Sequence, residues 1–199
     1  CENHRSDTPR ELLAELEHIN RYTEQALYYA RSEETQRDYL IRETPLGDVI
    51  HGAVADNKYL LRRHQVKVEV EDAGICACTD DKWLRFLLDQ LISNAIKYRG
   101  SDPKLRFVAG ERQGRVFLAV EDNGIGIQES DLPRIFDKGF TGTNGRLQKS
   151  STGIGLYLCR KLCDKLGIGL TAESGGRGKG TRMELTFPVD DFIAEVQDG

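Results

Sequence analysis

Three glycine-rich stretches, each at the edge of an expected helix or strand, constrain the fold of this chain more than any other feature. "VEDNGIGI" (120–127) follows an apolar strand, "STGIGLYL" (151–158) begins a helix, and "GGRGKGT" (175–181) precedes the last strand. At a helix start, paired glycines expose backbone N–H groups that can bind an anion, most obviously phosphate. One such stretch also describes an ordinary turn, but three together indicate a ligand that carries phosphate.

The periodicity of apolar residues predicts an α+β domain over residues 46–190. We expect helices at 46–63, 80–98 and 153–166, and a short helix or turn at 129–136. Strands are expected at 66–71, 75–79, 104–110, 115–122, 168–174 and 181–188. Helices and strands do not alternate one for one, which excludes a Rossmann fold. The order predicts a two-layer α/β sandwich, with a mostly antiparallel sheet and the helices on one face.

A separate long helix is predicted over residues 10–38, before a boundary at Pro45. Leu12, Leu16 and Ile19 begin a single apolar stripe, and such a stripe requires a packing partner. The chain has no second helix of this kind, so the partner is expected to be a missing segment or another copy. The chain begins with Cys1 rather than Met, and we therefore expect it to be a fragment.

Composition excludes several classes of function. The net charge of -4 gives no electrostatic reason to expect nucleic acid or an anionic membrane as the main partner. No apolar run approaches the roughly 20 residues that span a bilayer. Four of the five cysteines form C-x-C and C-x3-C pairs, at 76 and 78 and at 159 and 163. This spacing does not fit a structural zinc site, so we interpret these cysteines as small apolar residues in a reducing compartment.

The helix at 80–98 carries two distinct sets of side chains. Its apolar set, Leu84, Leu88, Leu91 and Ala95, lies on one face and is expected to face the core. About a third of a turn away lies a polar set: Gln90, Asn94, Lys97 and Tyr98. An amide oxygen is a suitable ligand for a hard cation, and a lysine can bind phosphate as a point charge. A solvated polar edge explains the same set equally well.

Asp122 ends an apolar strand and is followed by Gly124 and Gly126. A carboxylate in this place can accept a hydrogen bond from the exocyclic amine of a base. The glycines allow the backbone to approach a ring closely. This pattern favours a nucleotide site over a site for phosphate alone.

Taken in order, the motifs resemble those of bacterial sensor histidine kinases of two-component systems. The matching residues are Asn94, the run from Asp122 to Gly126, Phe136, Phe140, the Gly153-Ile154-Gly155 turn and the run from Gly178 to Thr181. The ATP-binding domain of these kinases belongs to the gyrase, heat-shock chaperone, histidine kinase and mismatch-repair superfamily, with a Bergerat-type fold. "ALYYARSEE", "FDKGFTGTNGR" and "STGIGLYLC" are similar, more narrowly, to Gram-positive kinases that respond to peptide antibiotics.

The resemblance implies ATP and Mg²⁺ as cofactors and a role for each matching residue. Asn94 would coordinate Mg²⁺, Lys97 would contact phosphate, Asp122 would accept from the adenine amine, and residues 137–152 would form a lid. The implied nucleotide-binding residues are Asn94, Lys97, Tyr98, Asp122, Gly124, Gly126, Ile127, Phe136, Thr152, Gly153, Ile154, Gly155, Leu156, Gly180 and Thr181. The implied catalytic residues are Gln90, Asn94 and Lys97.

Two positions depart from the family pattern. Many of these kinases have Asn where this chain has Gln90, and the ATP-hydrolysing relatives have a Glu that activates water. A glutamine cannot act as a general base, which favours phosphoryl transfer over hydrolysis. The second departure is the acceptor histidine. "HRSDTP" (4–9) has the spacing of the family's H-E-x-x-T-P motif, but no room remains for a first hairpin helix, so His4 is not expected to be the acceptor.

The resemblance therefore predicts three segments. Residues 1–42 would contain the second helix of a dimerisation hairpin, 46–190 the catalytic domain, and 191–199 a tail. The expected partners are a response regulator, the missing hairpin and a second copy in the full-length protein. This fragment is expected in the cytoplasm and its parent at the cell membrane, held there by missing N-terminal segments. An ATPase of the same fold and a non-catalytic nucleotide-binding scaffold are the alternatives.

Overall fold

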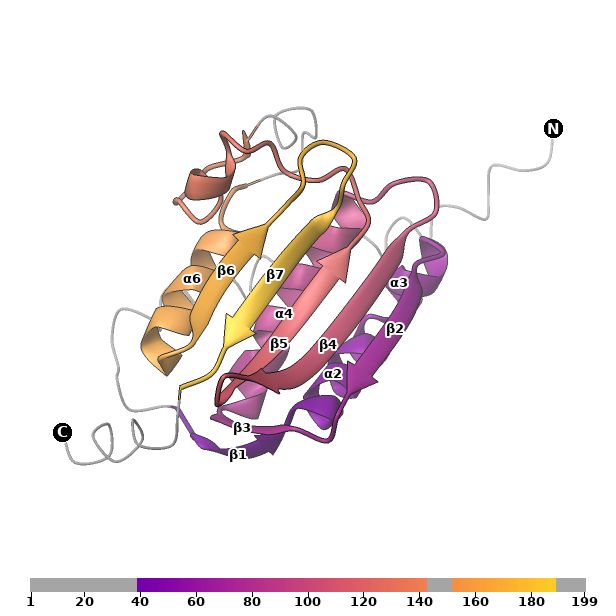
Figure 1. The fold of residues 1–199 in the computed structure, drawn as a ribbon. Coiled ribbons are helices and arrows are strands. Elements are labelled where there is room, and N and C mark those ends of the chain that lie inside the picture. The colour runs from indigo at the N-terminus through magenta and orange to yellow at the C-terminus, as the bar shows by residue number, and fades with distance from the viewer. Residues whose placement is uncertain (1–38, 143–151, 189–199) are drawn as a thin grey trace. The chain divides into compact units, whose positions relative to one another are not determined.

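A computed structural model describes residues 39–142 and 152–188 (Figure 1). Its main element is a five-stranded sheet in the order β2-β4-β5-β7-β6. These strands are β2 (Lys67–Asp72), β4 (Lys104–Arg112), β5 (Arg115–Asp122), β6 (Gly169–Glu173) and β7 (Thr181–Thr186). β2 runs parallel to β4, and the other neighbouring pairs are antiparallel. The α+β class and the mostly antiparallel sheet are confirmed.

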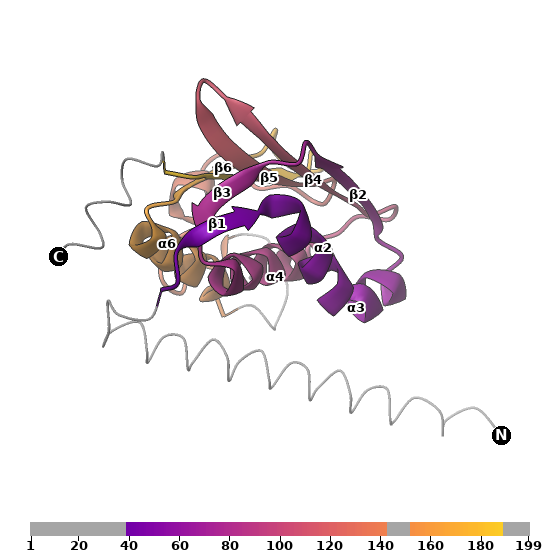
Figure 2. The ribbon, with the colours of Figure 1, turned by 90° about the horizontal axis from the view of Figure 1, so that it is seen from below.

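The helices of the domain lie on one face of this sheet, as predicted (Figure 2). They are α2 (Leu46–Asp56), α3 (Lys58–Arg63), α4 (Asp81–Lys97) and α6 (Gly155–Leu166), with a short 3-10 turn η1 at Leu132–Arg134. Between the layers lies the core, in which Leu84 and Leu88 of α4 and Phe107 of β4 are fully buried. The two-layer sandwich is therefore closed by the predicted apolar face of α4.

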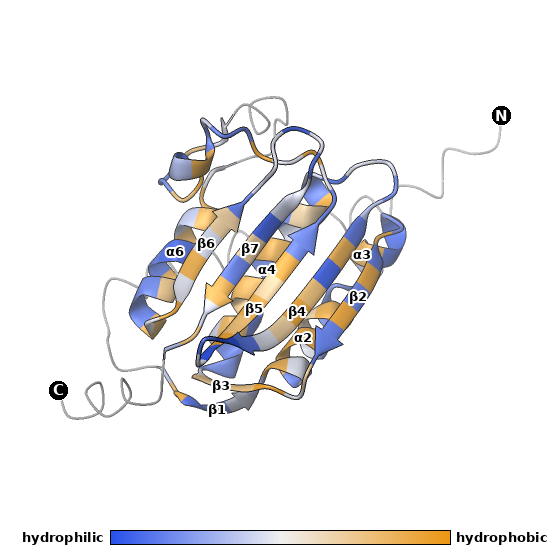
Figure 3. Ribbon diagram, in the orientation of Figure 1, coloured by the Kyte–Doolittle hydropathy of each residue, from blue (hydrophilic) through white to orange (hydrophobic). Residues whose placement is uncertain are grey.

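Buried and partly buried side chains alternate along the strands, which explains why helices cover only one face of the sheet. Leu105, Phe107 and Ala109 of β4 are buried, whereas the residues between them are only partly buried. Figure 3 shows the resulting alternation of hydrophobic and hydrophilic residues along the strands. Because successive side chains point to opposite faces, the second face of the sheet is polar and carries no helix among the described residues.

Two features near the start of the domain differ from expectation. β1 (Arg42–Pro45) pairs with β3 (Cys76–Thr79) in a small separate sheet, where we expected only a boundary. The single helix expected at 46–63 is divided at Asn57, whose backbone leaves helical geometry. The Asn57 side chain donates to the Ala53 carbonyl and to the Asp89 carboxylate, at 2.9 and 2.7 Å. The bond to Asp89 connects the break between α2 and α3 to α4.

The remaining predictions concern the cysteines and the two ends of the chain. Cys159 and Cys163 are buried in α6, as predicted for small apolar residues, and Cys76 and Cys78 are half-buried on β3. The long helix predicted at 10–38, His4 and the tail at 191–199 lie outside the described residues. Within the described ranges, no helix is long and apolar enough to cross a membrane.

Candidate nucleotide site

The end of β5, the start of β7 and the end of α4 lie together at one edge of the sandwich, opposite the small β1–β3 sheet (Figure 1). β5 ends at Asp122, directly across from the first residue of β7, Thr181. The turn that follows β5 is joined to the end of α4, because the Ile125 N–H donates to the Tyr98 carbonyl at 2.9 Å. The glycine-rich stretches after β5 and before β7 therefore meet beside the C-terminus of α4, as the nucleotide-site interpretation requires.

Asp122 lies on the helix-facing side of β5, two and four residues after the buried Val120 and Leu118. Its carboxylate accepts the Gly124 N–H at 2.8 Å and also the Thr181 N–H. Burial raises the pKa of the Asp122 carboxyl above its ordinary value, and these two hydrogen bonds offset part of the rise. The group is thus held in place by backbone donors on both glycine-rich stretches.

The raised pKa of Asp122 predicts a pH dependence of apo stability. Its folded-state pKa lies above the unfolded value of about 3.8, so the folded domain binds this proton more tightly than the unfolded chain. Ionisation of Asp122 therefore costs folding free energy, and the cost grows as pH rises from the unfolded pKa to the folded one. Asp122→Asn removes this titration.

Urea denaturation of both proteins at about pH 4 and about pH 7 measures the effect. We expect the free energy of unfolding of the wild type, relative to the variant, to be lower at the higher pH. A difference that does not change with pH would contradict burial as the dominant cause of the shift.

The two glycine-rich stretches are joined by a set of hydrogen bonds. The Gly180 N–H donates to the Gly124 carbonyl at 3.2 Å, and the Gly178 N–H to the Ile125 carbonyl at 2.6 Å. Ser174 completes the set, since its hydroxyl accepts the Ile127 N–H at 2.9 Å and donates to the Gly180 carbonyl at 2.6 Å. Ser174 was not predicted as a site residue, and only its place just before the third glycine stretch hinted at a role.

Gly126 shows why a glycine is needed at this crossing. Its φ is 70°, and a Cβ at this position would overlap the Gly176 carbonyl oxygen. The two backbones therefore pass each other with no room for a side chain. This close approach fixes the position of the turn after β5 relative to the stretch before β7.

Asn123 is a second residue whose function the sequence did not reveal. Its side-chain oxygen accepts the Lys104 N–H at 2.7 Å, and its amide donates to the Asp102 carbonyl at 2.8 Å. Asn123 thereby fastens the turn after β5 to the loop that enters β4. The bonds of Asn123 therefore also restrain the neighbouring residue, Asp122, relative to the loop before β4.

The polar set of α4 does not lie uniformly at the surface. Gln90 is only 6% exposed, so this amide is almost wholly buried. Asn94, Lys97 and Tyr98 are half-buried, and the Lys97 ammonium lies 5.6 Å from the centre of the Tyr98 ring. The last turn of α4, rather than its whole polar face, thus borders the crossing of the glycine stretches. The alternative explanation of the polar set as a solvated edge therefore does not apply to Gln90.

The N-terminus of α6 has the features of an anion site. The N-cap residue is Ile154, which has no side-chain oxygen to cap the helix, and the first turn contains no acidic residue. The N–H groups of Gly155 and Leu156 belong to the first turn, whose N–H groups have no intrahelical acceptor. Thr152 is exposed, and its hydroxyl accepts the Ile154 N–H at 3.4 Å. The predicted phosphate cradle is structurally compatible with an anion.

Phe136 and Gly153 connect the segment after η1 to α6. The Arg160 guanidinium stacks on the Phe136 ring at 4.4 Å and donates to the Leu170 carbonyl at 2.7 Å. The Gly139 N–H donates to the Gly153 carbonyl at 3.0 Å. These contacts anchor one end of the predicted lid, of which residues 143–151 lie outside the described residues.

Comparison with known proteins defines the class to which this site belongs. A family model described as histidine kinase-, DNA gyrase B- and HSP90-like ATPase matches residues 79–191. The chain belongs to this family, and it contains the catalytic ATP-binding domain of a two-component sensor histidine kinase.

Its relatives agree with the narrower resemblance to Gram-positive sensor kinases. Sensor histidine kinase GraS of Staphylococcus haemolyticus (strain JCSC1435) is 36% identical over 186 residues. Sensor protein kinase GraS of Staphylococcus aureus (strain N315) is 32% identical over 185 residues. Each alignment covers 92% of this chain and 53% of the relative, so the chain spans about half the length of these proteins.

Solved structures confirm the fold. Histidine kinase AdeS of Acinetobacter baumannii has a TM-score of 0.72 at 18% identity, covering 94% of this chain and 87% of that one. Histidine kinase ThkA, in a complex with the response regulator protein TrrA, has a TM-score of 0.70 at 20% identity. That match covers 94% of this chain and 52% of ThkA.

Proposed function

We propose that the domain binds Mg²⁺-ATP at the edge described above and donates the γ-phosphoryl group to a histidine on a dimerisation hairpin. A response regulator would then receive the phosphoryl group on an aspartate. One observation carries the nucleotide assignment. A half-buried carboxylate, Asp122, is held by backbone donors on two glycine stretches, in a domain whose α6 begins without a capping side chain.

Each part of the nucleotide has a matching group in the chain. The Asp122 carboxylate accepts from the adenine amine, while Gly124, Gly126, Ile127, Gly180 and Thr181 form the surrounding backbone. The N–H groups at the start of α6, from Gly153 to Leu156, receive the phosphates, and Lys97 adds a positive charge. Thr152, Phe136 and Tyr98 border the nucleotide. When bound, ATP supplies the γ-phosphoryl group and Mg²⁺ offsets the charge of the phosphates.

The residues present fit magnesium held mainly by the nucleotide. Among residues 39–142 and 152–188, no group of three or more His, Cys, Asp and Glu side chains could hold a metal. Mg²⁺ retains several waters and binds substrate phosphates together with one or two protein oxygens. The half-buried Asn94 amide oxygen on the last turns of α4 is suited to that single contribution.

Gln90 supports transfer rather than hydrolysis. It is buried and occupies the position at which hydrolytic relatives carry a glutamate, and an amide cannot remove a proton from water. We infer that Gln90 orients groups near the γ-phosphate without activating water. An ATPase would need a base that this position lacks.

Asn94→Ala tests the proposed metal ligand. We expect the affinity for ATP in the presence of Mg²⁺ to fall about tenfold, because one oxygen ligand is lost. The affinity for adenosine, which binds no metal, should stay unchanged. Titration calorimetry with both ligands measures the two constants, and an equal loss for adenosine would place Asn94 at the base instead of the metal.

The phosphotransfer proposal is tested with labelled ATP. The chain alone should acquire no label, because His4 is not expected to be the acceptor and the acceptor histidine would lie on the missing first hairpin helix. Adding a separately produced hairpin of the parent kinase should give an acid-labile label on that hairpin. Rapid phosphate release without an acceptor would favour an ATPase, and binding without transfer or release would favour a scaffold. A label on His4 would overturn its exclusion.

The same proposal extends to the parts of the protein beyond the catalytic domain. Residues 1–42 would supply the second hairpin helix, which pairs with the missing first helix and with a second copy of the chain. Residues 46–190 would form the catalytic domain and 191–199 a tail. The parent would be held at the cell membrane by segments before Cys1, with this part in the cytoplasm.

A further inference from the structure

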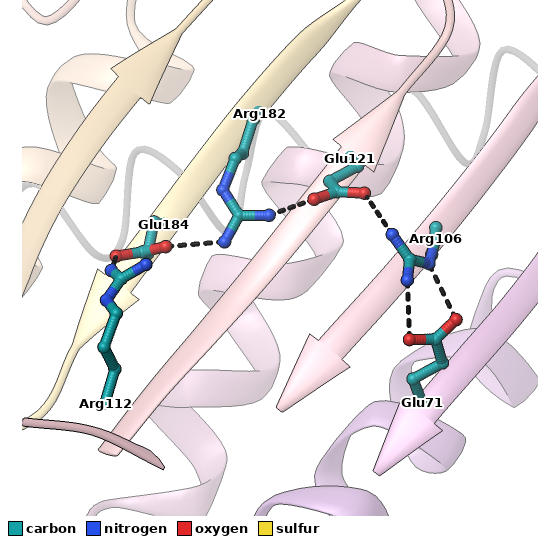
Figure 4. A network of polar contacts seen from close by, with 6 residues as sticks. All are labelled: Glu71, Arg106, Arg112, Glu121, Arg182 and Glu184. Carbon is teal, nitrogen blue, oxygen red and sulfur yellow. Dashed lines mark hydrogen bonds and ion pairs between the residues drawn. The ribbon is translucent and has the colours of Figure 1, made fainter. Parts of the chain in front are cut away.

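The polar face of the sheet carries a continuous row of six charged side chains that alternate in sign (Figure 4). We call this row the charge ladder; its members are Glu71, Arg106, Glu121, Arg182, Glu184 and Arg112. It crosses four strands, β2, β4, β5 and β7. Every neighbouring pair in the row forms an ion pair, so the ladder links strands whose other face covers the core.

The contacts are close along the whole ladder. Arg106 donates twice to Glu71, at 2.9 and 2.6 Å, and once to Glu121 at 3.0 Å. Arg182 donates to Glu121 and, at 2.6 Å, to Glu184. Arg112 completes the row with a 2.5 Å bond to Glu184. Arg182 and Glu121 therefore stand between partners of opposite charge on both sides.

Burial divides the ladder into a screened middle and exposed ends. The side chains of Arg182, Glu121 and Glu184 are 28%, 27% and 12% exposed, whereas those of Glu71 and Arg112 are 56% and 61% exposed. Exposed ion pairs contribute little, because solvent and salt screen them. Arg182 and Glu184 are the most withdrawn pair, but both belong to β7. Among the pairs that join two strands, Glu121–Arg182 is the one in which both side chains are less than a third exposed, so its attraction is screened less than that of the others.

The position of this pair in the sheet connects it to the candidate nucleotide site. Glu121 lies directly opposite Arg182 in the pairing of β5 with β7, and the next opposed pair is Asp122 and Thr181. Glu121 and Asp122 point to opposite faces of the sheet. The ion pair therefore joins the two strands one residue away from the place where the Thr181 N–H donates to the Asp122 carboxylate.

The pair also lies where the strands begin to separate. β7 starts at Thr181, and residues 174–180 before it belong to no strand. Beyond Asp122 the two segments are held by the backbone bonds from Gly180 and Gly178 and by Ser174. A side-chain ion pair at the last opposed position but one before this crossing limits how far β7 can move from β5.

We propose that Glu121 and Arg182 are positioning residues for base recognition, acting on the far face of the sheet through Asp122. They hold the start of β7 against the end of β5, so that the Thr181 N–H keeps the Asp122 carboxylate aimed at the exocyclic amine, while Gly180 holds Gly124, the second donor to that carboxylate. They do not touch the nucleotide. This inference rests on the proposed role of Asp122.

Discrimination between ATP and inosine triphosphate is the readout, because inosine carries a carbonyl where adenine carries the amine. A role in overall stability alone would weaken both ligands equally. Arg182→Gln and Glu121→Gln are expected to reduce the ATP preference about threefold to tenfold, mainly by weakening ATP. Arg182→Lys keeps the charge but not the planar fork that bridges Glu121 and Glu184, so its loss should be smaller than that of Arg182→Gln. Arg112→Gln breaks the same ladder at its far end and should leave the preference unchanged.

Affinities are measured by titration calorimetry, with thermal melting of each variant to compare stability. Exchanging the two charges is not a suitable rescue, because it would place Arg beside Arg106 and Glu beside Glu184. If Arg182→Gln and Arg112→Gln have the same effect on the preference, the positioning role is wrong. Asp122→Asn distinguishes the adenine role of Asp122 from the positioning role of Glu121 and Arg182. If this variant keeps the preference for ATP, the proposed adenine role fails and this inference fails with it. If Asp122→Asn abolishes the preference but Arg182→Gln does not reduce it, only the positioning role fails.

Discussion

Replacing Asp122 by asparagine is expected to weaken ATP binding by about 2–4 kcal/mol. The carboxylate already accepts the Gly124 and Thr181 N–H groups and, in our proposal, the adenine amine as well. An asparagine of the same size offers one oxygen and one amide donor. Either a backbone donor loses its acceptor or a donor faces the amine, and a charge-assisted bond is lost in both cases.

Titration calorimetry with a non-hydrolysable ATP analogue measures this loss, which corresponds to about 30-fold or more in Kd. Asp164→Asn offers a control, because it changes the same kind of side chain at an exposed position near the C-terminal end of α6. We expect that control to bind like the wild type. Unchanged affinity in Asp122→Asn would remove this residue from base recognition.

Gly180→Ala is expected to have the second large effect, on both stability and binding. Gly180 has a φ of 73°, and a Cβ there would overlap the Asp122 carbonyl oxygen and press on the Asn123 Cα. Both are backbone atoms, which cannot move aside as a side chain can. We expect a loss of about 2–4 kcal/mol in the free energy of unfolding and no measurable binding of ATP.

Gly114→Ala is the matched control for this change. Gly114 lies in the β4–β5 turn with the same φ of 73°, but a Cβ there would meet no atom within 4 Å. It should cost only the conformational term of about 1 kcal/mol and leave ATP affinity intact. Urea denaturation gives both stabilities. Equal losses in the two variants would show that close backbone approach at Gly180 is not the cause.

The sequence was sufficient to predict the elements that rely on local pattern. The apolar face of α4 and the strands β4, β5 and β7 follow from periodicities that are read within ten to twenty residues, roughly the length of one element. Asp122 and the glycine stretches could be singled out as candidates for the same reason, since each occupies a recognisable position at the end of an element.

The features that were missed depend on partners far away in the chain. β1 has four residues and includes Pro45, so only its pairing with β3 makes it a strand. The break at Asn57 is stabilised by Asp89, 32 residues later. Gln90 looked like part of a polar edge, but α4 packs deeply enough to bury it. Asn123, Ser174 and the charge ladder could not be predicted without the strand register that brings their partners together.

The most direct test of the account is a crystal structure of this domain with Mg²⁺ and a non-hydrolysable ATP analogue. The account predicts the adenine amine within hydrogen-bond distance of the Asp122 carboxylate, with the phosphates at the start of α6 and the metal near Asn94. The far end of α4 also has a hollow, lined among others by Arg42, Asp48 and Arg85. A nucleotide bound in that hollow, or on the charge ladder, with no contact to Asp122, would contradict the account.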